Sequence, residues 1–162
     1  MNRTQKPTLK VARILIVSLL GGLVLFTATV IGLRTAGSSP PPSQLAPGQS
    51  NVLLLALVGL CVVETPLFFL VPRMILRSYA AKWAAARSDD ERETVVLTAL
   101  QVVAIIRGAF VEGIGLFGCV IYMISGEPLA LIAPGVAIAV MIGLIPTREK
   151  QEALTRRLSS PT

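Results

Sequence analysis

Four long apolar segments alternate with polar segments along the 162-residue chain. They cover about residues 12–33, 51–71, 105–125 and 128–146, and each is close to the twenty or so residues that a helix needs to cross roughly 30 Å of hydrocarbon. The pattern predicts an all-α membrane protein: a single transmembrane domain over residues 1–162, with four transmembrane helices in two hairpins.

Three polar segments separate and follow the expected spans. Residues 34–50 are rich in Pro, Ser and Gly, a composition typical of an extended outer loop. Residues 72–104 form a basic cytoplasmic segment, and residues 147–162 form a cytoplasmic tail that we expect to be a short polar helix or a disordered end. Pro66, within the second span, and Pro134-Gly135, within the fourth, are candidate kinks.

The cytoplasmic segment contains two helix signals. Helix-forming residues dominate from Met74 to Ala86, and Tyr79 and Trp83 are four residues apart, so we expect a short interfacial helix at the membrane surface. Ser88 is followed by acidic residues up to Glu91, which is a capping-box pattern that starts a new helix. That helix would be longer than the membrane is thick if it continued to Ser125, and the pattern leaves its continuity open.

Positive charge predicts the orientation of the spans. The N-terminus, the segment 72–92 and the tail hold four, five and four Lys or Arg residues, whereas the two opposite loops hold one and none. Because basic loops stay in the cytoplasm, we expect a multi-pass protein of the bacterial inner membrane with both termini cytoplasmic. A cleaved signal peptide is the alternative interpretation of the first segment.

The same charges predict the partners. We expect anionic lipids at the cytoplasmic face rather than nucleic acid, with a homo-oligomer or another membrane protein as the candidate protein partner. The lipid-interface candidates are two aromatic and three basic residues in or next to the interfacial helix: Tyr79, Trp83, Arg73, Arg77 and Lys82.

Composition excludes several classes of function. With 53% hydrophobic and 15% charged residues and a mean hydropathy of +0.72, the chain is not a water-soluble domain. It has no histidine, which excludes His-ligated haem, His-based metal sites and His proton relays. Cys61 and Cys119 are isolated within apolar runs and are interpreted as apolar fillers. We therefore expect no cofactor and no metal.

Three charged residues inside the apolar segments are the candidate functional residues. Glu112 and Glu64 are each 13 residues from the outer end of their span, so their carboxyl groups should lie at similar depth. Arg107, nearer the cytoplasmic boundary, can extend toward the headgroups, whereas Glu112 cannot. Charged side chains at membrane depth usually face a bundle interior and have a partner.

The expected arrangement follows from helix geometry. Small and polar residues, Gly108, Glu112, Gly115, Cys119 and Tyr122, form one stripe of the third span, which suits close helix packing. We expect Glu112 to pack toward the second span near Glu64 and to be neutral near pH 7, or to share its charge with Arg107. Arg107 lies about 140° from Glu112 around the helix, so it could pair with Glu64 instead.

The segment from Ala104 to Gly118, Ala-Ile-Ile-Arg-Gly-Ala-Phe-Val-Glu-Gly-Ile-Gly-Leu-Phe-Gly, resembles a motif in small, uncharacterised bacterial multi-span membrane proteins. More distantly, residues 104–128 resemble the carboxylate-bearing helix of the c-type proteolipid subunits of rotary ATPases. That resemblance implies a role for Glu112 as a proton carrier.

Three functions remain as hypotheses. The first is a structural or accessory membrane protein in which Glu64, Arg107 and Glu112 form a polar clamp between helices. The second is a proton- or ion-coupled carrier, or a proteolipid-like subunit, that uses Glu112 and Glu64. The third, an intramembrane enzyme, lacks any Ser-Lys, paired-Asp or metal-ligand signature, so no catalytic residue is assigned.

Overall fold

The computed structural model describes residues 9–37 and 48–159, and the regular structure in these residues is entirely helical, which confirms the all-α prediction. Helices Lys10–Thr35, Asn51–Ala85 and Asp89–Ser125 are each long and apolar enough to cross a membrane. The bent pair Pro128–Leu144 and Glu149–Arg156 makes a fourth if it is counted as one span. The expected four spans are therefore three or four by length and composition.

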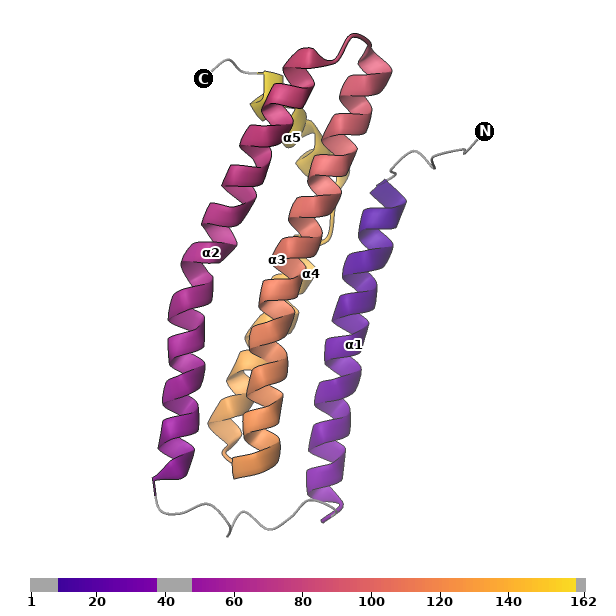
Figure 1. Cartoon of the computed structure of the whole chain (residues 1–162). Helices are drawn as coiled ribbons and strands as arrows, with labels where there is room; N and C mark the ends of the chain where they lie inside the picture. The colour runs from indigo at the N-terminus through magenta and orange to yellow at the C-terminus, as the bar shows by residue number, and fades with distance from the viewer. Residues whose placement is uncertain (1–8, 38–47, 160–162) are drawn as a thin grey trace, which may run out of the picture.

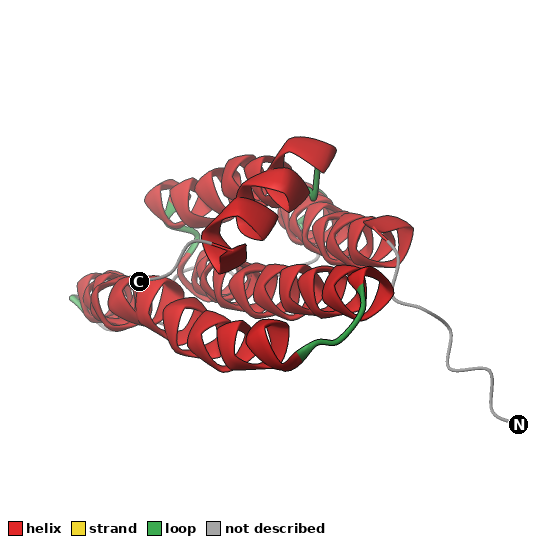
Figure 2. Ribbon diagram, turned by 90° about the horizontal axis from the view of Figure 1, so that it is seen from above, coloured by secondary structure: helices red, strands yellow, loops and turns green. Residues whose placement is uncertain are grey.

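The helix labelled α3, Asp89–Ser125, is the centre of the bundle. It packs against α1 (Leu9–Thr35), α2 (Gln49–Ala85) and α4 (Ile132–Leu144), and α1 also packs on α4. Figure 1 shows α3 between α1 and α2, with α4 behind it, and Figure 2 shows the same helices from above. Most of the helix contacts in the core therefore involve α3.

Helix α1 carries apolar side chains both on the face that packs in the bundle and on its exposed faces. Ala12, Ile16, Leu23 and Val30 recur at helical spacing and are buried in the bundle. The other faces carry exposed apolar side chains such as Leu25, which is 70% exposed. Exposed apolar surface on this scale is compatible with a helix that crosses a membrane.

Helix α2 corrects the prediction of a separate interfacial helix. It continues without interruption through Pro66 and Pro72 to Ala85, so residues 74–85 are the end of a 37-residue helix, roughly 55 Å long. Thr65 Oγ1 donates to the carbonyl oxygen of Cys61 at 2.6 Å. The carbonyl that loses its donor at Pro66 is that of Val62, so Thr65 does not replace that particular bond.

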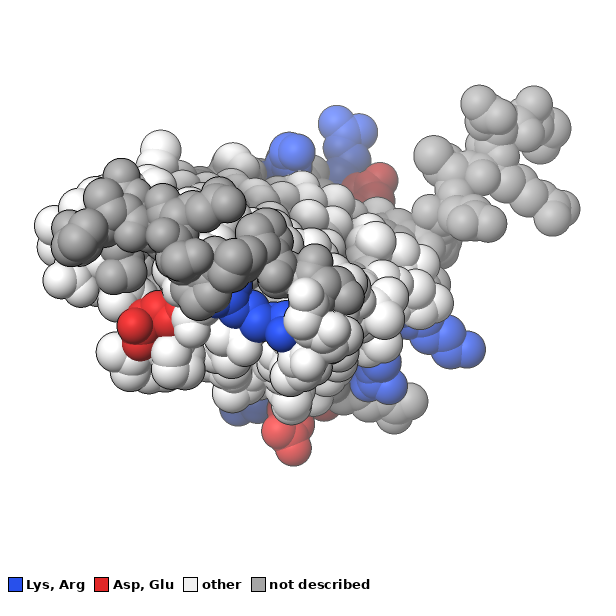
Figure 3. All heavy atoms as spheres, turned by 90° about the horizontal axis from the view of Figure 1, so that it is seen from below, with Lys and Arg blue, Asp and Glu red and all other residues white. Residues whose placement is uncertain are grey.

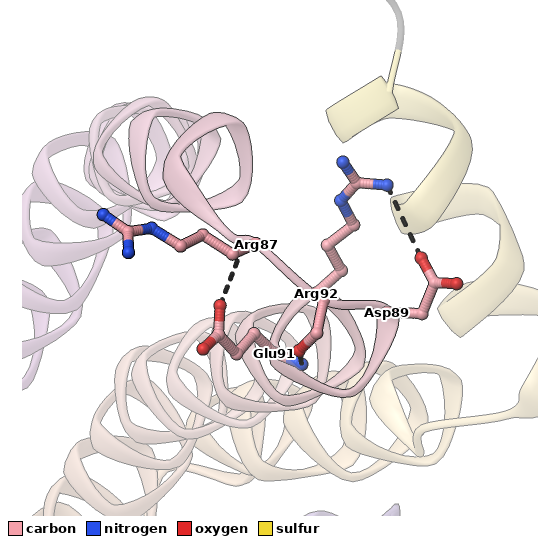
Figure 4. Close-up of polar contacts among 5 residues, drawn as sticks. Arg87, Asp89, Glu91 and Arg92 are labelled. Atoms are coloured by element: carbon pink, nitrogen blue, oxygen red, sulfur yellow. Dashed lines mark hydrogen bonds and ion pairs between the residues drawn. The ribbon is translucent and has the colours of Figure 1, made fainter.

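Helix α3 begins as its sequence predicts and is continuous to Ser125. Ser88 Oγ accepts a hydrogen bond from the Glu91 backbone N–H at 3.2 Å, as in a capping box. The Glu91 carboxylate accepts from the backbone N–H of Arg87, one residue before the cap, at 2.7 Å (Figure 4). Arg92 and Asp89 form an exposed ion pair at 3.5 Å in the same turn.

The opposite end of α3 is closed by Gly126 and Arg34. Gly126 has φ +72°, and its N–H donates to the Tyr122 carbonyl at 2.8 Å. Arg34, from the end of α1, donates to the Met123 carbonyl at 2.8 Å and lies 5.6 Å from the centre of the Tyr122 ring. A cation at a helix C-terminus is favourable. In Figure 3, which views this end, basic atoms lie near the middle and acidic atoms lie to their left, among mostly uncharged atoms.

The last part of the chain bends twice. A 3₁₀ turn, η2 (Pro128–Leu131), leads into α4, where Pro134 lies in the first turn. A proline there loses no hydrogen bond, so the expected kink at Pro134 is replaced by the change of helix type before it. Helix α5, Arg148–Ser159, then turns by 72° from α4 and packs against α3 and α2. The tail is thus helical from Arg148 to Ser159.

Candidate functional site: Glu64 and Glu112

Each candidate carboxylate lies against a glycine of a neighbouring helix. Glu112 Oε1 is 3.9 Å from the point where a Cβ on Gly22 of α1 would lie. Glu64 Oε1 is 3.8 Å from the corresponding point on Gly113 of α3. Because Gly113 follows Glu112 in the sequence, the two carboxylates lie at the same level of the bundle.

The structure therefore directs Glu112 toward α1, whereas the sequence suggested an orientation toward α2. The reason is angular: residues 112 and 113 differ by about 100° around α3, and α2 approaches α3 at Gly113. Glu64 reaches α3 from α2, and Glu112 reaches α1 from α3. On the side of α3 between α1 and α2, Glu112 therefore lies at the edge next to α1 and Glu64 at the edge next to α2.

The two carboxylates have no cationic partner within residues 9–37 and 48–159. Both side chains are half-buried, and Glu64 Oε2 is fully buried without a hydrogen-bond partner among the described residues. An ionised carboxylate in an apolar environment is costly unless it is paired, so this environment favours the protonated form in each case.

Arg107 belongs to a different part of the bundle. Its guanidinium lies 5.1 Å from the centre of the Phe68 ring of α2 and lines a cavity near the start of α5. The structure records no ion pair between Arg107 and either Glu64 or Glu112 in the part of the chain that it describes. The polar clamp of Glu64, Arg107 and Glu112 stays a prediction.

One side of α3 has no helix over it between α1 and α2. Ala109 and Met123 are exposed on α3 and lie 14 residues apart, on the same face. Glu112 borders this face on the α1 side, and Gly113 with Glu64 borders it on the α2 side. Figure 1 shows no other helix in front of α3 on this side, and this partly covered face is called the exposed strip. The positions between Ala109 and Met123 on it are half-buried: Gly113, Leu116 and Val120. Both carboxylates are therefore next to a surface that a lipid tail or another helix could reach.

The small residues of α3 make the close contacts that the sequence predicted. The nearest atoms to a Cβ built on Gly108 belong to Ile16 and Leu19 of α1, and Cys119 Sγ is 3.3 Å from Thr27 Oγ1. Gly118, which the predicted stripe omitted, is packed most tightly, against η2 and α4. Sequence spacing could not find Gly118, since its importance comes from the path of η2.

The lipid-interface candidates divide into two groups. Tyr79 and Trp83 are half-buried and pack around a small core of Val96, Ala99 and Leu154, so they contact α3 and α5. The basic candidates Arg73, Arg77 and Lys82 are exposed. The two aromatic residues expected at the membrane interface thus also pack between helices.

Two residues near the carboxylates were missed by the sequence analysis. Gly22 and Gly113 provide the space into which Glu112 and Glu64 extend. Gly113 directly follows Glu112, which is a weak signal, whereas Gly22 becomes relevant only after α1 has packed on α3.

Comparison with known proteins assigns no function to the site. No protein-family model matches the chain, and neither the curated proteins nor the solved structures contain a match. Among the described residues, no group of three or more His, Cys, Asp or Glu side chains is placed to hold a metal ion.

Proposed function

We propose that the chain is a four-span protein of the bacterial inner membrane, with both termini cytoplasmic, that exchanges protons or a small cation through Glu112 and Glu64. The observation that supports this most is the pair of carboxylates at one level, beside the exposed strip of α3, without an ion-pair partner in the described residues. An ionisable residue inside a membrane that is not neutralised by a partner is a functional candidate by default.

The chemistry follows from the environment. A carboxyl group that is protonated at rest and lies beside a lipid-accessible strip can release its proton when water or a cation reaches it, and it can then be reprotonated. Two such groups at one level, at opposite edges of the same face of α3, can each exchange a proton with water or a cation that reaches that face. Gly22 and Gly113 leave room for the carboxyl groups to change rotamer.

Proton flux through reconstituted vesicles tests the proposal. A potassium diffusion potential should drive proton uptake that a pH-sensitive dye detects in vesicles with the wild-type protein. Glu112→Gln should fold and abolish the uptake, because an amide cannot release a proton. Glu93→Gln, at an exposed position near the start of α3, is the matched control and should leave the uptake unchanged.

A carbodiimide reagent provides the second arm. It reacts with a protonated carboxyl in an apolar site, so Glu112 should be labelled more slowly as the pH rises from about 5 to 9. Wild-type vesicles that take up no more protons than empty ones, together with no labelling at any pH, would rule out proton exchange.

A structural or accessory role is the second candidate, and the glycine contacts favour it. A protonated carboxyl against a glycine can donate a hydrogen bond to a backbone carbonyl and hold two helices together. In that case Glu112→Gln, which retains a donor, should preserve both fold and assembly, whereas Glu112→Leu should weaken them.

A further inference from the structure

A cavity of about 320 Å³ lies near the end of the bundle where α1 begins and α2 ends. Its lining comes from α2, α3, the end of α4 and α5, but not from α1. The volume is within the range of cavities that hold small ligands. Unlike the exposed strip beside Glu64 and Glu112, it is built around two cations.

Among the described lining residues, Arg107 and Lys150 carry charge and none is acidic. The Arg107 guanidinium lies over the Phe68 ring. Lys150 Nζ donates to the carbonyl oxygens of Gly143 and Ile145 at the end of α4, which fixes the ammonium at one wall. An ammonium has three donors, so one N–H remains for a ligand. The cavity is therefore suited to an anion.

The remaining lining is aliphatic and includes Leu76, Leu100, Leu144 and Leu154. Such walls are unfavourable for a small, fully hydrated anion but favourable for one attached to hydrocarbon. Outside the cavity, apolar side chains remain exposed on both α2 and α4: Met74 is 70% exposed and Ile142 is 55% exposed. Acyl chains could pack on these two surfaces while a phosphate occupies the cavity.

We propose that the cavity holds the phosphate of one anionic phospholipid, bound by Arg107 and Lys150, with its acyl chains against α2 and α4. The inference rests on the membrane location proposed above and not on proton exchange. It differs from a general attraction between lipids and basic loops because one molecule is bound at one place. The bound lipid would link α5 to the transmembrane helices.

Native mass spectrometry of the purified chain, titrated with phosphatidylglycerol or phosphatidylcholine, tests the proposal. We expect one tightly bound phosphatidylglycerol per chain and weaker binding of phosphatidylcholine. Arg107→Gln and Lys150→Gln should each weaken the binding by about fivefold, since one basic residue near a lipid phosphate contributes about that factor.

Controls separate the site from general electrostatics. Arg73→Gln and Arg77→Gln remove the same charge from exposed positions of α2 and should leave the affinity unchanged. Ala153→Phe changes no charge but fills the cavity from an exposed position of α5, and it should abolish the tight binding. This variant remains informative even where loss of Arg107 disturbs the fold.

Three results would overturn the inference. The first is equal loss of affinity in the Arg73 or Arg77 variants, which would indicate a diffuse basic surface. The second is tight lipid binding that survives Ala153→Phe. The third is displacement of phosphatidylglycerol by inorganic phosphate at low millimolar concentration, which would assign the cavity to a free anion.

Discussion

Single residues determine how closely the helices approach, and Gly118 is the clearest case. A Cβ on Gly118 would lie 2.7 Å from Ala133 Cβ and 2.8 Å from the Ala130 carbonyl oxygen. The second neighbour is backbone, so it cannot move without displacing η2. This part of α3 therefore tolerates no side chain at all.

We expect Gly118→Ala to lower the free energy of unfolding by about 1–3 kcal/mol, through overpacking between α3 and η2. The measurement is unfolding in mixed micelles at increasing denaturing detergent, followed by circular dichroism. Gly135→Ala is the control, because no atom lies within 4 Å of a Cβ there. Equal stability of the two variants would contradict the packing described for Gly118.

Gly126 combines a backbone requirement with a contact. Its φ of +72° is unfavourable for any other residue, and a Cβ there would also collide with the Arg34 guanidinium. Gly126→Ala should destabilise the protein by more than the roughly 1 kcal/mol of backbone strain. Gly37→Ala, at φ +69° with no atom within 4 Å, carries the strain alone and is the matched comparison in the same unfolding measurement. If the two variants lose the same stability, the Arg34 contact contributes nothing.

At the scale of elements, the surprising feature is α5. Its composition is polar, yet Leu154 is buried against Val96 and Ala99, with Trp83 packed at the edge of the same cluster. This small core joins α5 to the end of α2 and the first part of α3, beyond the expected membrane boundary. Leu154 thus gives a helix of polar composition a buried apolar contact with the bundle.

We expect Leu154→Ala to release α5, since it removes the buried contact and leaves a cavity costing about 2–5 kcal/mol. Trp83 is the only tryptophan, so its fluorescence should shift to longer wavelength as water reaches it. Ala153→Ser, at an exposed position on the same helix, should leave the emission unchanged. An unaltered spectrum in Leu154→Ala would show that α5 docks by other contacts.

For the whole molecule, the antiparallel order of α1, α2 and α3 fixes which ends share a side. The start of α1, the turn between α2 and α3, and α5 lie at one end, and the ends of α1 and α3 lie at the other (Figure 1). This end-to-end arrangement holds whether or not a membrane surrounds the bundle. The distribution of Lys and Arg predicts that the first end is cytoplasmic.

Reporter fusions test that orientation. A reporter active only in the cytoplasm should function after residue 87 and after residue 162, and a reporter active only outside should function after residue 44. The reason is the excess of basic residues in the first, middle and last polar segments. Activity of the cytoplasmic reporter after residue 44 would contradict both the four-span count and the orientation.

Composition and local sequence are enough to predict the helices and the start of α3. Long apolar runs fix helices of membrane-crossing length, because a backbone in hydrocarbon must satisfy its own hydrogen bonds. Ser88 fixes the start of α3, because a capping hydroxyl is a local interaction, and the placement of Glu64 and Glu112 at one level follows from the helical rise alone.

The neighbour that each side chain contacts depends on how the helices pack together. Helix α2 continues through Pro72 to Ala85. Its last residues, which by sequence alone were expected on a membrane surface, pack instead against α3 and α5. Glu112 faces Gly22, and Arg107 lies over Phe68. These directions depend on the rotation of α3 about its own axis, which its packing against three neighbouring helices sets. Sequence spacing reports depth along a helix, but the direction around it is set by close packing between helices that are distant in the chain.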